Sequence, residues 1–112
     1  MATLIDDYKS AAEAHGEGTK EGNSKKANKA YKDLNKVLAE LIAQGEDSAL
    51  LGLLDDPNVW VQLWAAAHTL EVDEQQARAK LQSIVDAAIP IACLDARYTL
   101  QGWDSGDLKF RS

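Results

Sequence analysis

Residues 56–70 constrain the fold more than any other stretch, because they predict a helix that is apolar on almost every side. Asp56 can cap this helix, and Pro57 suits its first position, where a missing N–H costs nothing. At about 100° per residue, apolar side chains cover both faces and one flank of the helix, and Gln62 and Thr69 form a narrow polar seam. A helix of this kind is expected inside a helical array.

A shift of 30 residues partly superposes this stretch on the chain that follows it. The matches lie mainly at apolar positions: Ala49, Leu51, Asp56, Ala66, Thr69 and Leu70 fall on Ala79, Leu81, Asp86, Ala96, Thr99 and Leu100, and His68 falls on Tyr98. The repeat predicts helix pairs that cannot bury their apolar faces alone. The run Leu-Leu-Asp-Asp-Pro at 53–57, followed by a valine and an alanine-rich segment, resembles the core of a HEAT repeat. A basic residue often follows that valine in the family, whereas Gln62 and Ala92 stand there in this chain.

Helical periodicity and capping signals predict about six helices in three antiparallel pairs, and no segment alternates as a strand would. The pairs span roughly residues 4–44, 48–70 and 74–102, followed by a C-terminal tail at 103–112. A chain of 112 residues has room for one core, so we expect a single domain. The predicted fold is all-α, a HEAT-like or armadillo-like α-α superhelix whose end is capped by the tail, with Phe110 folding back.

Capping residues mark the expected helix ends. Thr3 is predicted to cap the first helix, and Asn23 or Ser24 the second. Pro90 is predicted to start the sixth helix and Gly102 to end it. The inward face of that helix is predicted to hold Ile91, Leu94, Tyr98 and Leu100.

Three longer segments carry a second resemblance. They are Gly22-Asn23-Ser24-Lys25-Lys26-Ala27-Asn28-Lys29-Ala30-Tyr31, then Trp64-Ala65-Ala66-Ala67-His68, then Gly102-Trp103 with Gly106-Asp107-Leu108-Lys109-Phe110. Together they look like a family of small bacterial HEAT-like helical domains of unknown function. The resemblance spans nearly the whole chain, and it implies the fold and no activity.

The sequence offers little support for catalysis. It contains no HExxH segment, paired cysteines, EF-hand loop or P-loop, so we expect no enzyme, no metal and no cofactor. No apolar run approaches the roughly 18 residues of a membrane span, and we expect no membrane association. The single Cys93 predicts a reducing, cytoplasmic setting, and it is expected to be a small buried residue.

The predicted second helix carries a basic stripe, in which Lys25, Lys29, Lys32 and Lys36 follow i, i+4, i+7, i+11. The stripe is either a binding surface or a solvated helical face. Residues 1–45 carry seven basic and seven acidic side chains, and residues 46–112 carry five and eleven, so the net charge of −6 lies in the second part. Because an acidic surface repels phosphates, we expect no nucleic-acid partner. A basic protein partner would suit this charge.

The leading hypothesis is a non-catalytic protein–protein interaction module, with an immunity or inhibitor protein as a narrower version. Its exposed surface is expected to include Gln62 and Thr69 on the central helix, with Asp95 and Thr99 on the last. The partner would be another protein, and a homodimer would cover any apolar face of the first helix or the tail that the array leaves open.

An alternative hypothesis is a small-ligand binder or enzyme with a pocket near Trp64, His68 and Tyr98, where aromatic and imidazole side chains occupy matching repeat positions. Against a pocket or an exposed aromatic platform, we expect both Trp60 and Trp64 to lie mostly in the core. Leaving them in water would forfeit on the order of 3 kcal/mol each.

Overall fold

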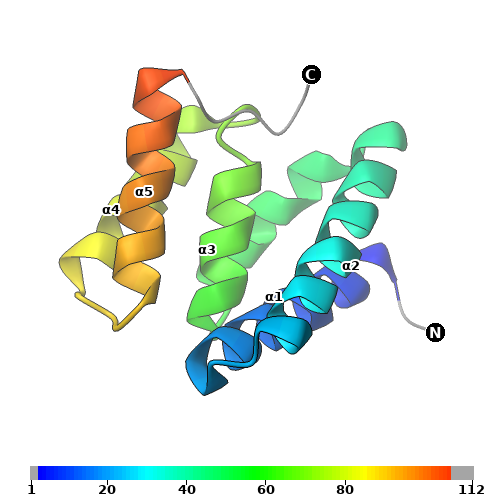
Figure 1. Cartoon of the computed structure of the whole chain (residues 1–112). Helices are drawn as coiled ribbons and strands as arrows, with labels where there is room; N and C mark the ends of the chain where they lie inside the picture. Colours follow the sequence, from blue (N-terminus) through cyan, green and yellow to red (C-terminus); the bar gives the residue numbers. More distant parts are fainter. Residues whose placement is uncertain (1–2, 107–112) are drawn as a thin grey trace. The chain divides into compact units, whose positions relative to one another are not determined.

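A computed structural model describes residues 3–106 of the chain, and all of their regular structure is helical. The elements are α1 (Leu4–Glu21), α2 (Ser24–Ala43), the 3₁₀ helix η1 (Asp47–Asp55), α3 (Val59–His68), α4 (Glu74–Asp86) and α5 (Ala92–Ser105) (Figure 1). Across the described residues there are six helices and no strand, which confirms the predicted all-α fold class. None of these helices is long and apolar enough to cross a membrane.

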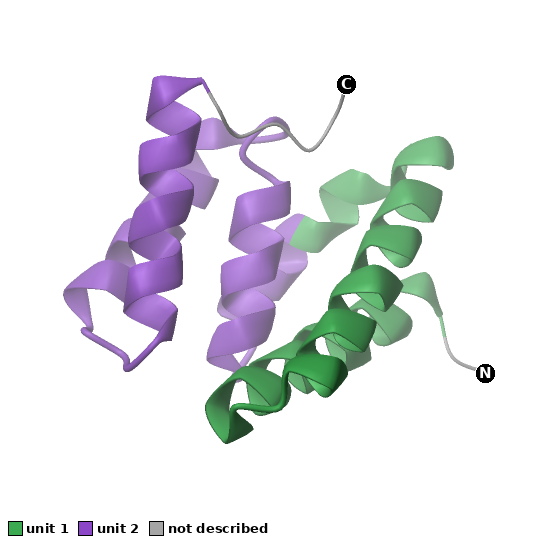
Figure 2. Cartoon of the chain, viewed as in Figure 1, with its two compact units in different colours: residues 1–50 green, residues 51–112 purple. Residues whose placement is uncertain are grey.

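The chain divides into two compact units, residues 1–50 and residues 51–112 (Figure 2). The boundary falls inside η1, which is the short helix expected at the start of the pair at 48–70 and has 3₁₀ geometry. In the second unit, α3 packs against both α4 and α5.

The first unit is built on a hairpin of α1 and α2, and the sequence predicted its ends correctly. The hydroxyl of Thr3 accepts a hydrogen bond from the N–H of Asp6, and Asn23 Oδ1 accepts one from the N–H of Lys26. Gly22 ends α1 in the left-handed conformation, with φ of 70°. The buried side chains of the hairpin include Tyr8, Ala12, Leu34, Leu38 and Leu41.

A glycine permits close contact between these two helices. A Cβ atom at Gly18 would lie 2.8 Å from the backbone nitrogen of Ala27, too close for any side chain. The sequence alone suggests that Gly18 weakens α1, yet in the fold it lets α2 approach α1 near their connecting turn.

The predicted start of α3 is wrong by two residues. Asn58, rather than Asp56, caps the helix, and its Oδ1 accepts hydrogen bonds from the N–H groups of Trp60 and Val61. Asp56 instead accepts the N–H of Asn58, so Pro57 lies in the turn before the helix. Trp60 is buried as predicted, whereas Trp64 is half-buried.

The last two helices pack on each other and are joined by an exposed ion pair between Arg78 of α4 and Asp104 of α5. The Arg78 guanidinium lowers the pKa of the Asp104 carboxyl through a hydrogen bond. Asp73 caps α4 by accepting a hydrogen bond from the N–H of Gln76.

The predicted limits of α5 are both wrong. The helix begins at Ala92, two residues after Pro90, and continues through Gly102 to end at Gly106, which is left-handed with φ of 81°. Residues 103–105, expected in the tail, therefore belong to α5. The predicted folding back of Phe110 lies outside the described residues.

The predicted inward face of α5 is also wrong. Ile91, Leu94 and Tyr98 are exposed, and the fully buried residues of the helix are Ala92 and Ala96. Small side chains let α5 pack closely on its neighbours, which leaves the larger apolar side chains on the outside. Cys93 was expected to be buried, but it is half-buried.

Candidate functional site

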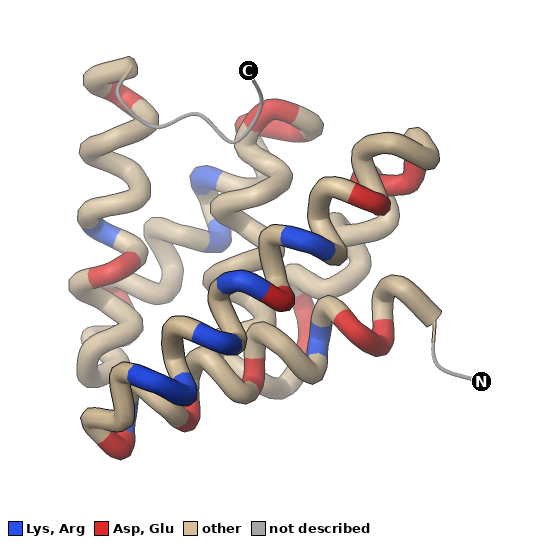
Figure 3. The backbone as a smooth tube through the Cα atoms, turned by 45° about the vertical axis from the view of Figure 1, so that its right-hand side comes forward, with Lys and Arg blue, Asp and Glu red and all other residues tan. Residues whose placement is uncertain are grey.

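The four lysines predicted as a binding stripe lie together on the exposed face of α2, opposite its buried leucines. The basic residues of α2 follow one another along the helix in Figure 3. Within residues 3–106, Lys29 forms an ion pair with Asp33, with 3.0 Å between Nζ and Oδ2, and Lys25, Lys32 and Lys36 form none. The structure therefore brings the stripe together as a basic surface.

Lys26, beside this stripe, has a structural role. Its ammonium group lies 3.0 Å from Glu17 and 3.6 Å from Glu21, and the hydrogen bond to Glu17 raises the pKa of Lys26. Both acidic residues lie in the last turns of α1. The contacts of Lys26 with Glu17 and Glu21 thus offset the unfavourable position of a positive charge in the first turn of α2.

Thr69 does not lie on an exposed surface, which corrects the prediction. It is 0% exposed, and its hydroxyl donates to the carbonyl oxygen of Ala65 at 2.7 Å. The side-chain amide of Gln62 is half-buried and donates to the carbonyl oxygen of Asp56. Gln62 therefore holds the turn before α3, and the two polar residues do not form an open seam.

On α5, Asp95 and Thr99 are both half-buried. The hydroxyl of Thr99 donates to the carbonyl oxygen of Asp95 at 2.7 Å, one helical turn earlier. Both residues border the exposed apolar side chains of the same helix. They can contribute to the edge of a surface on α5.

Trp64, His68 and Tyr98, which were expected to border a pocket, differ in exposure. The rings of Trp64 and His68 lie on successive turns of α3 with 5.4 Å between their centroids. Burial lowers the pKa of His68 to about 3, so this imidazole is neutral near pH 7. Tyr98 is 65% exposed, against 2% for His68. The pocket near these three residues stays a prediction.

Three apolar residues that were expected to face inward form an exposed apolar surface at α5, which we call the α5 stripe and define as Ile91, Leu94 and Tyr98. These side chains are 39%, 48% and 65% exposed. Leu94 and Tyr98 lie one turn apart on the same face of α5, and Ile91 is the residue directly before the helix. Ile91 also has φ of 67°, which is strained for a β-branched residue. Periodicity did reveal the stripe, but it could not show that the stripe faces outward.

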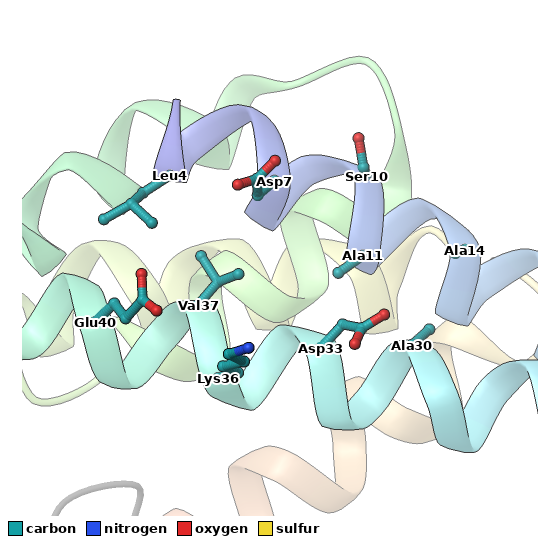
Figure 4. Close-up of a pocket in the computed structure, with 10 residues that line it drawn as sticks. All are labelled: Leu4, Asp7, Ser10, Ala11, Ala14, Ala30, Asp33, Lys36, Val37 and Glu40. Atoms are coloured by element: carbon teal, nitrogen blue, oxygen red, sulfur yellow. The ribbon is translucent and has the colours of Figure 1, made fainter. Parts of the chain in front are cut away.

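A second missed feature is a groove between α1 and α2 with a volume of about 430 Å³ (Figure 4). Its lining residues are Leu4, Asp7, Ser10, Ala11 and Ala14 from α1, and Ala30, Asp33, Lys36, Val37 and Glu40 from α2. Three of the ten are alanines, which are too small to fill the space between the helices. No sequence motif marks this groove, because it depends on how the two helices pack.

No metal site is evident in the described part of the chain, where no three His, Cys, Asp or Glu side chains gather closely enough to hold an ion. The polar side-chain contacts include helix caps, turns, ion pairs between helices and pairs within one helix. The candidate binding surfaces are the lysines of α2, the α5 stripe and the groove.

Comparisons with known proteins identify the family. No curated protein matches the chain. A solved structure, the protein RPA1889 from Rhodopseudomonas palustris CGA009, is similar with a TM-score of 0.87 and 27% sequence identity, over 95% of this chain and 89% of that one. A family model described as a domain of unknown function matches residues 4–104. The chain therefore belongs to the DUF2019 family.

Proposed function

We propose that this protein is a non-catalytic protein–protein interaction module and that the α5 stripe is its main contact surface. The observation that carries the proposal is the exposure of Leu94 and Tyr98 on one face of α5, together with Ile91 directly before the helix. Large apolar side chains grouped on a surface are typical of protein contacts, and tyrosine is among the residues that contribute most to binding. Asp95 and Thr99 would form part of the polar edge of this contact.

The overall organisation supports a HEAT-like arrangement as part of the proposal. The pairs α1–α2 and α4–α5 each consist of neighbouring helices joined by a short connection, as in repeats of that kind. A single cysteine supports a reducing, cytoplasmic setting. The net charge of −6 supports the narrower idea of an immunity or inhibitor protein that binds a basic partner.

The test is affinity capture from a nuclease-treated lysate of the source organism, with the parent protein and two variants as bait. Leu94→Ser with Tyr98→Ser removes the centre of the α5 stripe. Lys25→Glu with Lys29→Glu, Lys32→Glu and Lys36→Glu reverses the stripe on α2. Because both sets of side chains are exposed, each variant should keep its fold, which circular dichroism checks.

We expect the parent and the lysine variant to retain the same defined protein and the α5 variant to lose it. Losing two central apolar contacts costs about 2 kcal/mol or more, which is roughly a 30-fold weaker affinity. Equal recovery by the parent and the α5 variant would show that the contact surface lies elsewhere. If only the lysine variant failed to retain the protein, the contact surface would lie on α2.

A further inference from the structure

The groove between α1 and α2 combines an apolar floor with acidic edges. Ala11 and Ala30 are 8% and 3% exposed and form the floor, together with Ala14. In Figure 4, Leu4 points from α1 toward α2, and Val37 and Glu40 point back toward α1. With a volume of about 430 Å³, the groove is large enough for an aliphatic side chain.

The charges that line the groove favour a cationic occupant. Asp7, Asp33 and Glu40 contribute three carboxylates against the single ammonium group of Lys36. Asp33 is paired with Lys29, whereas Asp7 and Glu40 form no ion pair with any residue between 3 and 106. Two carboxylates on opposite helices are thus available to basic side chains.

We propose that this groove docks a basic, amphipathic segment of a protein partner. An aliphatic side chain of the segment packs on the three alanines, and lysine or arginine side chains on either side of it meet Asp7 and Glu40. The groove lies within residues 1–50, whereas the α5 stripe lies within residues 51–112. The two surfaces are independent, so either can fail in experiment while the other holds.

A direct test uses a synthetic helical peptide of leucine and lysine, together with a matched peptide that carries glutamate in place of lysine. Binding to the full chain is followed by isothermal titration and by amide chemical shifts. Asp7→Asn with Glu40→Gln removes the two available charges with little change in shape. Glu46→Gln with Asp55→Asn makes the same change in charge at exposed residues outside the groove and serves as the control.

We expect the lysine peptide to bind the parent and the control equally, with shift changes centred on the groove, and the glutamate peptide not to bind. The groove variant should bind about five- to tenfold more weakly, as for the loss of two exposed ion pairs. Ala14→Leu fills the floor of the groove and keeps its charges. It should weaken binding of the lysine peptide more than the groove variant does.

Several results would overturn the proposal: no binding of the lysine peptide, equal binding by the parent and the groove variant, or unchanged binding by Ala14→Leu in a folded protein. Spermidine is tested in parallel as a small cation without an aliphatic side chain. If it competes as well as the peptide does, the groove is a site for small cations and not for a protein segment.

Discussion

The fold strongly lowers the pKa of the His68 imidazole. His68 lies at the end of α3 and is 2% exposed, and its ring is tilted by 37° to the ring of Trp64. Burial lowers its pKa from the ordinary value of 6.5 to about 3. Near pH 7 the folded protein therefore holds a neutral imidazole, and His68 acts as a packing residue whose charge state is coupled to folding.

Protonation of His68 should make the protein less stable in acid. Below pH 6.5 the unfolded chain binds a proton at this residue, while the folded chain does not until about pH 3. The free energy of unfolding should thus fall as the pH drops through this window, by about 3 kcal/mol at pH 4 from this group alone. His68→Leu should lose that share of the pH dependence in urea unfolding measured from pH 7 to pH 4. The same dependence in parent and variant would show that His68 is hydrated or paired in the folded state.

At the scale of elements, the contact between α1 and α2 depends on Gly18. Gly18→Ala places a Cβ atom 2.8 Å from the backbone nitrogen of Ala27, which cannot move without shifting α2. Alanine favours the helix by up to about 1 kcal/mol, but the clash costs about 1–3 kcal/mol. We therefore expect a net loss of about 1 kcal/mol or more in the free energy of unfolding by urea.

Gly52→Ala is the matched control for this prediction. Gly52 is exposed, and no heavy atom lies within 4 Å of the position that its Cβ would take. This variant should unfold at the same urea concentration as the parent or at a slightly higher one. A Gly18→Ala protein as stable as the Gly52→Ala protein would mean that the helices are farther apart near their turn.

The two ends of the chain differ in how well sequence predicts their helices. Thr3 and Asn23 set the ends of α1 and α2 by local hydrogen bonds, which are readable from a few residues. The orientation of α5 is set instead by tertiary packing. One face of this helix carries alanines, and another carries larger apolar side chains. Periodicity favours burial of the larger side chains, whereas the fold buries Ala92 and Ala96.

At the scale of the molecule, the all-α class and the number of helices follow from periodicity and capping, whereas the surfaces do not. Thr69 is polar in sequence but buried, because its hydroxyl bonds to its own helix. The groove exists only because alanines of α1 and α2 face the same space. The lysines of α2 are the candidate residues whose exposure the sequence predicted, since charged side chains rarely enter a core.

The charge distribution and the exposed apolar side chains motivate the proposed interaction with a protein. The net charge of −6 arises from residues 46–112, and the exposed apolar side chains of α5 lie within that same part. Opposite charge on a partner would speed association, while burial of the α5 stripe would hold the complex together. We therefore propose that a protein partner covers the α5 stripe.

Photo-crosslinking from Tyr98 in cells of the source organism tests this claim most directly. A benzophenone amino acid replaces Tyr98 in one protein and Gln75, an exposed residue of α4, in the control. The account predicts one defined crosslinked protein from position 98, absent from position 75 and lost when Leu94→Ser is added. The same products from both positions, or none from position 98, would contradict the assignment of α5 as the contact surface.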